Sequence, residues 1–211
     1  MVKELFKDLE FEESTHSYYL NGEKLLGATT FISLFFPHFN AWEIIPRIEN
    51  KDKYKDMSGY AIKQSWEDVS SRGTTIHEAL ENYLNNEAYD ADTDCVRQGI
   101  NYIDSYLEGY SYEVFPELTM FCAEGVAGTA DVPIIIDNKY IHIVDWKTNK
   151  SLSWYGYGKT GTHRATKHLE ASKLQKYELQ LSLYAYMLEQ KSGCVARDLR
   201  VVWLKPGGGV E

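Results

Sequence analysis

The sequence GTADVPIIIDNKYIHIVDWKTNK, residues 128–150, predicts two paired β-strands. Isoleucine and valine favour strands, and the polar residues 137–139 favour a turn between them. With a three-residue turn, Ile136 pairs with Tyr140, and the rest of the hairpin follows from that pair. Such an apolar segment is expected to be buried. The charged residues near its ends therefore need an explanation, because burying charge is costly.

Counting outward from that pair sets Asp131 opposite Asp145, unless Pro133 marks a bulge that shifts the register. Because side chains alternate along a strand, Asp145 and Lys147 share one face and Trp146 points to the other. Two carboxylates on neighbouring strands repel each other unless a cation lies between them. Oxygen ligands favour a hard ion such as Mg²⁺ or Mn²⁺, so the hairpin predicts a divalent-cation site.

This set of charged groups suits phosphodiester hydrolysis. A divalent cation polarises a phosphoryl oxygen and lowers the pKa of an attacking water. A fixed ammonium such as that of Lys147 neutralises charge that develops in the transition state. Charged residues also commonly end strands, so Asp145-x-Lys147 by itself leaves an ordinary structural role open.

The rest of the sequence predicts an α/β or α+β domain with one central mixed sheet. The predicted elements, in chain order, are a β-hairpin over 11–30, a short helix over 29–36, helical pieces over 41–70 interrupted at Pro46 and Ser58-Gly59, helices over 70–84 and 94–109, three strand-like runs over 110–148, a helix over 171–190 and a strand over 199–206.

Composition indicates one well-packed domain of 211 residues with 44% hydrophobic and 25% charged residues. We expect no secretory signal and no membrane-spanning segment. The three cysteines suit a reducing cytoplasm and exclude a four-cysteine iron–sulfur site within one chain. The net charge of −9 argues against nucleic acid at first sight. A basic loop over about residues 149–166 follows Lys147, however, and is a candidate for contacts with a nucleic-acid backbone.

Four motifs together resemble a known family. Gly128-Thr129-Ala130-Asp131 and Val144-Asp145-Trp146-Lys147-Thr148 resemble the core of the PD-(D/E)xK nuclease superfamily, in particular its RecB-like exonuclease branch. Gly73-x-x-x-His77 before this core and Gln180-x-x-x-Tyr184 after it are similar to two further motifs of that branch. Residues 11–33 are similar to the opening of phage-type and mitochondrial genome-maintenance exonucleases.

The resemblance implies an α/β fold with a restriction-endonuclease-like core: a central mixed β-sheet flanked by helices, with an N-terminal hairpin and a helical arch. It implies a single nuclease domain over residues 1–211, with the hairpin and helical lobe over 1–70 and the core over 71–205. The implied activity is hydrolysis of single-stranded DNA or DNA ends by an exonuclease without an iron–sulfur cluster. The implied location is the cytoplasm of a bacterial or phage-infected cell.

The resemblance also implies roles for individual residues. The expected ligands of one or two Mg²⁺ or Mn²⁺ ions are His77, Asp131, Asp145 and the backbone carbonyl of Trp146, with Glu117 as an outer-shell candidate and Glu124 as its competitor. The other expected catalytic residues are Lys147, which positions water and stabilises charge, and Gln180 and Tyr184, which steady the phosphate and the lysine. Gly73 and Thr148 of the motifs are expected substrate contacts. Lys150, Lys159, Arg164 and Lys167 are further expected contacts because they belong to the basic loop that follows Lys147, which otherwise is an ordinary solvated loop.

Some alternatives remain open on the sequence. His77 also fits a solvent-facing or capping role. A zinc hydrolase of the His-Glu-x-x-His type is disfavoured because position 81 is Glu. The same core serves endonucleases. A non-catalytic module that binds DNA, or a recombination or replication protein, is a further possibility.

Overall fold

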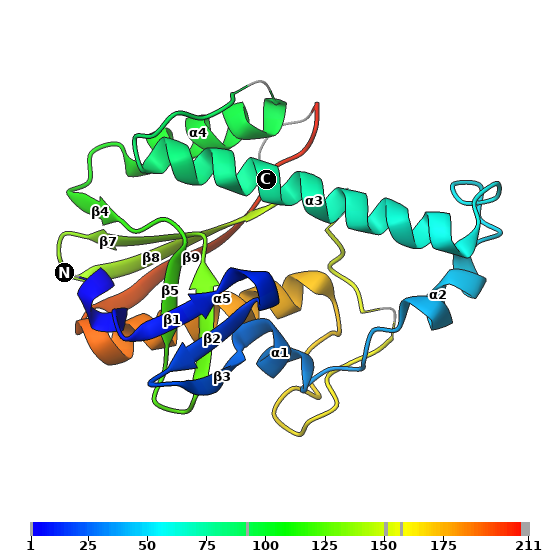
Figure 1. Ribbon diagram of the computed structural model, residues 1–211, viewed down its shortest axis with the longest axis horizontal. Helices are drawn as coiled ribbons and strands as arrows, with labels where there is room; N and C mark the ends of the chain where they lie inside the picture. Colours follow the sequence, from blue (N-terminus) through cyan, green and yellow to red (C-terminus); the bar gives the residue numbers. More distant parts are fainter. Residues whose placement is uncertain (1, 92, 150–151, 157, 208–211) are drawn as a thin grey trace.

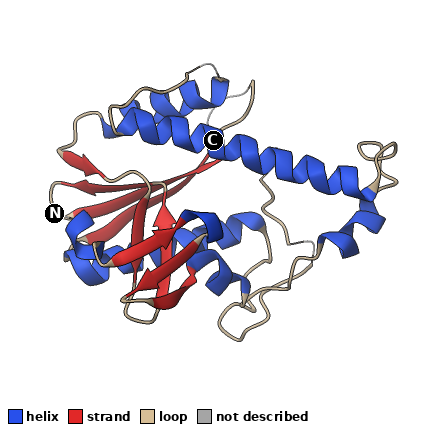
Figure 2. Cartoon of the chain, viewed as in Figure 1, coloured by secondary structure: helices blue, strands red, loops and turns tan. Residues whose placement is uncertain are grey.

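The computed structural model describes residues 2–91, 93–149, 152–156 and 158–207. Their strands form two mixed sheets with helices packed on them, so the architecture is α/β (Figures 1 and 2). The prediction of one central sheet was wrong. The region 110–148 contains five strands rather than three, and they are divided between the two sheets.

The five-stranded sheet contains the N-terminal hairpin. Its strands, in spatial order, are β1 (Leu9–Glu12), β2 (Ser17–Leu20), β3 (Glu23–Gly27), β6 (Val126–Ala130) and β5 (Leu118–Phe121). The predicted turn at Asn21-Gly22 is confirmed, with φ of 52° and 79° at these two residues. The parallel pairing of β3 with β6 joins the hairpin to the rest of the protein.

The four-stranded sheet contains the hairpin that was predicted first. Its strands, in spatial order, are β4 (Tyr112–Val114), β7 (Val132–Ile136), β8 (Tyr140–Lys147) and β9 (Val195–Trp203). The predicted register is confirmed, because Ile136 pairs with Tyr140 and Val132 with Val144. Pro133 pairs with Ile143 in the same register, so it introduces no slip between the two strands.

Five α-helices and two short 3₁₀ helices complete the described chain. They are η1 (Lys3–Phe6), η2 (Glu13–Thr15), α1 (Ala28–Ser33), α2 (Ala41–Ile48), α3 (Gly59–Leu84), α4 (Asp94–Leu107) and α5 (Lys173–Ser192). Pro46 lies inside α2 and does not interrupt it, contrary to the prediction. The helix predicted over 70–84 is the second half of α3, which begins after the Ser58 N-cap, so the expected division at residue 70 falls inside this helix.

Helices cover both faces of the four-stranded sheet (Figure 1). On one face Ile134, Val144 and Trp146 are buried with residues of α3 and α4. On the other face Ile135 and Ile143 are buried with residues of α5, which also packs on the five-stranded sheet. This double burial explains why β7 and β8 are so rich in Ile and Val, since a strand covered on both sides needs apolar residues at every position.

A bent two-stranded ribbon, in which residues 112–121 pair with residues 126–136, connects the two sheets. Its β4–β7 and β5–β6 pairs are joined by backbone hydrogen bonds from Phe115 to Pro133 and from Glu117 to Asp131, each 2.9 Å. Glu117 has φ 46°, in the left-handed region that non-glycine residues rarely adopt. The bend therefore sets Glu117 opposite Asp131 at the junction of the two sheets.

Helix α3 approaches the end of β8 closely at Gly73. A Cβ atom at this position would lie 2.8 Å from Oγ1 of Thr148, which is itself buried. We expect Gly73→Ala to lower the free energy of unfolding, because overpacking costs about 1–3 kcal/mol against a gain of about 1 kcal/mol in helix propensity. Urea unfolding measures the difference. Gly73→Ala combined with Thr148→Ala should recover the loss, and a Gly73→Ala variant at least as stable as the wild type would contradict the close approach.

Candidate metal centre

Three side chains from α3 and the ribbon converge at the bend. The donor atoms of His77, Glu117 and Asp131 lie within 4.8 Å of one another, and all three residues are partly buried. His77 Nδ1 is 3.4 Å from Oδ2 of Asp131. Imidazole and carboxylate groups are ligands for Mn²⁺, and carboxylates for Mg²⁺, so the donor set suits such a cation. Glu117, expected only in an outer shell, therefore belongs to the donor group itself.

The two acidic members of this group differ in protonation behaviour. Burial, together with the neighbouring charge of Asp131, raises the pKa of Glu117 to about 8. Burial also acts to raise the pKa of Asp131, but His77, the charge of Lys147 and the Trp146 N–H together outweigh it and hold that pKa below its usual value. For His77, burial lowers the pKa, whereas the Asp131 carboxylate raises it and prevails. The protein therefore supplies too little positive charge to stabilise Glu117 in its anionic form. A bound cation would supply the missing charge.

Asp145 and Lys147 form an ion pair next to this group. The Lys147 ammonium contacts Oδ2 of Asp145, whose side chain is 2% exposed. Burial raises the pKa of Asp145 to about 6, and the charge of Asp131 contributes to the shift. Burial would lower the pKa of Lys147, but Asp145 and Asp131 raise it, so the lysine is cationic. Within the described ranges, the mutually close donor group does not include Asp145. Its role as a direct metal ligand stays a prediction.

Trp146 connects the ion pair to the donor group through its backbone. Its side chain is buried on the face opposite Asp145, as predicted, while its N–H donates to Oδ2 of Asp131 (2.8 Å). The N–H and C=O of a strand residue point to the same side. This favours the predicted Trp146 carbonyl as a further oxygen at this edge, although its contact with a cation stays a prediction.

Helix α5 contributes a residue that the sequence reasoning missed. The Lys147 ammonium lies 4.6 Å from the centre of the Tyr177 ring, and the Tyr177 hydroxyl donates to Oδ1 of Asn149 (3.3 Å). No motif in the sequence singled out Tyr177. Its position one turn before Gln180 was the available signal, since residues three apart share a helix face.

Gln180 and Tyr184 contact each other as their spacing predicts. The Gln180 amide donates to the Tyr184 hydroxyl (2.8 Å), and Tyr184 is 2% exposed. Its ring packs over Gly128, where a Cβ would lie 2.7 Å from the ring. Glycine at this position of the Gly-Thr-Ala-Asp sequence therefore makes room for Tyr184. Contact of either side chain with a phosphate stays a prediction.

The expected substrate residues divide into two groups. Gly73 and Thr148 are buried against each other, so their packing accounts for both residue types without a substrate. Lys159, Arg164 and Lys167 are exposed on the loop between β8 and α5. Lys150 lies outside the described residues. Glu124, the competitor of Glu117, lies in the β5–β6 turn and accepts a hydrogen bond from Tyr186 (2.6 Å) instead.

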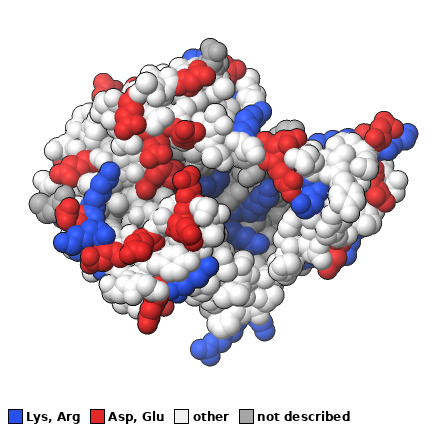
Figure 3. Space-filling view, viewed as in Figure 1, with Lys and Arg blue, Asp and Glu red and all other residues white. Residues whose placement is uncertain are grey.

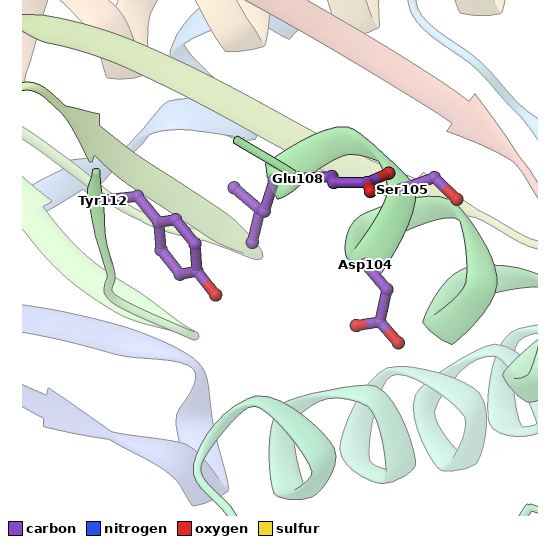
Figure 4. A pocket seen from close by; sticks show the side chains of 5 residues that line it. Asp104, Ser105, Glu108 and Tyr112 are labelled. Atoms are coloured by element: carbon purple, nitrogen blue, oxygen red, sulfur yellow. The ribbon is translucent and has the colours of Figure 1, made fainter. Parts of the chain in front are cut away.

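One surface pocket is lined by none of the candidate site residues. A pocket of about 430 Å³ lies at the end of α4 and is lined by Asp104, Ser105, Leu107, Glu108 and Tyr112 (Figure 4). Its carboxylates make it unsuited to a phosphate. No helix in the described ranges combines the length and the apolar character needed to cross a bilayer.

No protein-family model matches this chain, and a search of curated proteins finds no similar sequence. The resemblance to RecB-like nucleases therefore stays a prediction from the sequence motifs.

The affinity for a divalent cation should rise with pH. Glu117 must lose a proton before it can bind an ion, and its pKa is raised to about 8. Calorimetric titration with Mn²⁺ is expected to show an affinity that increases about tenfold per pH unit between about pH 6 and pH 8. Glu117→Gln should weaken binding and flatten this dependence, whereas Glu113→Gln, an exposed residue of the same ribbon, should change neither. An affinity that is constant over this range would rule Glu117 out as a ligand.

Proposed function

We propose that this protein is a divalent-metal-dependent DNA exonuclease with a restriction-endonuclease-like core, acting in the cytoplasm on single-stranded DNA or DNA ends. The observation that carries this proposal is the convergence of the His77–Glu117–Asp131 donor group and the Asp145–Lys147 ion pair at the edge where the two sheets meet. The four motifs of the predicted family supply every residue of this convergence except Glu117.

The donor set fits one or two Mg²⁺ or Mn²⁺ ions, held by His77, Asp131 and Glu117, with Asp145 and the Trp146 carbonyl as further candidates. Such an ion supplies a polarised phosphoryl oxygen and a water of lowered pKa.

The protein's own contribution centres on Lys147. Its ammonium is held between Asp145 and the face of Tyr177, so its position is fixed before a substrate arrives. A fixed positive charge stabilises the negative charge that builds up on a phosphate in the transition state. Oδ2 of Asp131 both faces Nδ1 of His77 and accepts the Trp146 N–H, so Asp131 links the donor group to the strand that carries Lys147.

Incubation of the purified protein with linear and circular single-stranded DNA tests this proposal. We expect linear DNA to be degraded in Mn²⁺ or Mg²⁺, circular DNA to persist, and EDTA to stop the reaction. Cleavage of the circle would instead identify an endonuclease. Binding of DNA without any cleavage would favour a non-catalytic module. A protein that neither binds nor cleaves DNA would refute a role in DNA metabolism.

A further inference from the structure

Positive charge is concentrated in one segment of this acidic protein. Residues 147–176, here called the basic segment, contain seven of the 22 Lys and Arg residues and one of the 31 Asp and Glu residues. The segment runs from Lys147 at the end of β8 into the first turn of α5. A polyanion is therefore the kind of ligand that this part of the protein favours, in spite of the net charge of −9.

Large exposed side chains occur both in the basic segment and in a second segment that is hydrogen-bonded to it. We call residues 34–68 the arm; it contains α2 and the first half of α3, and it extends from the main body (Figure 1). In the arm, Tyr60 is 77% exposed and Phe39 61% exposed. In the basic segment, Tyr155 is 73% exposed and Trp154 67% exposed. Among the described large hydrophobic residues, the five most exposed are these four and Leu34, which also belongs to the arm.

Hydrogen bonds hold the two ring-bearing segments together. The backbone N–H of Thr162 and the hydroxyl of Thr166, both in the basic segment, donate to the carbonyl of Phe35 in the arm (2.8 and 2.9 Å). Figure 3 shows a hollow between the main body and the arm, with Lys and Arg atoms inside it. The exposed rings are thus carried by segments that share one end of the molecule with a strongly basic surface.

We infer that Phe39, Tyr60, Trp154 and Tyr155 form a stacking surface for the unpaired bases of a single DNA strand, whose phosphates are bound by the exposed Lys159, Arg164 and Lys167 of the basic segment. Aromatic rings stack on nucleobases of any sequence, and cations beside them bind the backbone. A duplex cannot use such rings, because its base faces are already covered by neighbouring base pairs. This inference rests on the proposed function, which supplies DNA as the ligand, and it adds the residues that select unpaired DNA.

The alternative occupant of exposed rings is a protein partner. A docking surface for a protein is usually depleted of lysine, whereas the ring-bearing basic segment is rich in it. Trp42, also in the arm, has its ring 5.0 Å from that of Tyr60 in an edge-to-face arrangement and packs near Gly59. Trp42 therefore has a structural role in the arm, and Tyr60 is the better residue to replace in a test.

Binding measurements with three DNA probes test this inference. Fluorescence anisotropy in EDTA, which prevents cleavage, would compare a thymidine strand of about 20 nucleotides with an abasic strand of the same length and with the matching duplex. We expect the wild type to bind the thymidine strand most tightly. Trp154→Ala combined with Tyr155→Ala, and separately Tyr60→Ala, should weaken binding of the thymidine strand by about tenfold but leave binding of the abasic strand unchanged.

The control is Tyr110→Ala combined with Tyr112→Ala, which removes two rings that are 49% and 48% exposed outside both ring-bearing segments. It should bind every probe as the wild type does, and thermal unfolding should show that all variants are folded. Equal binding of the abasic and thymidine strands by the wild type, or full affinity in the ring variants, would overturn the inference. DNA cleavage in Mn²⁺ is measured separately: ring-dependent binding without cleavage would refute the proposed function alone, and cleavage without ring dependence would refute this inference alone.

Discussion

Asp131→Asn should abolish tight Mn²⁺ binding and reduce DNA hydrolysis by about 10³-fold while leaving the fold intact. Asp131 is the residue that both His77 and the Trp146 N–H contact, at 3.4 and 2.8 Å. The asparagine side-chain oxygen can still accept the Trp146 N–H, so the strand edge keeps its hydrogen bond. The anionic ligand is lost, and with it the main attraction for a divalent cation.

Calorimetry with Mn²⁺ and a single-turnover cleavage assay measure these two effects. Asp137→Asn is the matched control, because Asp137 lies in the exposed turn of the same hairpin with φ 53°, a conformation that asparagine tolerates. The control should bind metal and cleave DNA as the wild type does. If Asp131→Asn bound Mn²⁺ with unchanged affinity, the donor group at the ribbon bend would not be the metal centre.

Lys147→Met should reduce hydrolysis by about 10²–10³-fold and also destabilise the protein. The loss of activity follows because the substitution removes the fixed charge that Lys147 holds between Asp145 and Tyr177. The loss of stability follows because Asp145, 2% exposed, is left as a buried charge without a partner, which costs about 3–5 kcal/mol.

The destabilisation should depend on pH in a defined direction. The pKa of Asp145 is already raised to about 6 by burial, above its unfolded value, and loss of Lys147 raises it further. The folded variant then holds a proton that the unfolded chain releases, so its stability falls as the pH rises above the unfolded pKa of about 4. Urea unfolding near pH 5 and near pH 8 should show the larger loss at the higher pH.

A double variant separates the two effects of Lys147. Lys147→Met combined with Asp145→Leu removes both charges and should recover most of the stability, since an apolar pair can replace a buried ion pair. It should not recover hydrolysis. If the Lys147→Met protein cleaved DNA at the wild-type rate, Lys147 would have no role in the hydrolysis.

Local sequence determined the hairpin at the centre of this protein. The two runs rich in Ile and Val and the three-residue polar turn at 137–139 specified which residues of β7 and β8 face each other, because the length of the turn fixes the register of a hairpin. The same pattern was enough to place Trp146 in the core and Asp145 with Lys147 on the opposite face. Helices α4 and α5 were likewise predictable from their apolar periodicity, since their ends have clear caps at Thr93 and Ser172.

Tertiary structure decided how the strands are divided between sheets. β3 pairs with β6 through Leu26 and Val126, which are far apart in sequence, and no local pattern specifies such a partner. The bend of the ribbon depends on Glu117 in a left-handed conformation, which nothing in its neighbouring residues required. That bend is also why the role of Glu117 was underestimated: only the folded chain turns its carboxylate toward His77 and Asp131.

The sequence by itself therefore determined the chemical content of the candidate centre, a set of carboxylates, an imidazole and a lysine, and which of them share a strand face. Only the tertiary structure decided which atoms meet. It brought His77 to the ribbon from a helix that begins at Gly59, placed the Tyr177 ring against Lys147, and joined the arm to the basic segment through the hydrogen bond from Thr166 to the carbonyl of Phe35. The physical reason is that alternation along a strand is a local property of the backbone, whereas the approach of separate elements depends on how their apolar faces pack together.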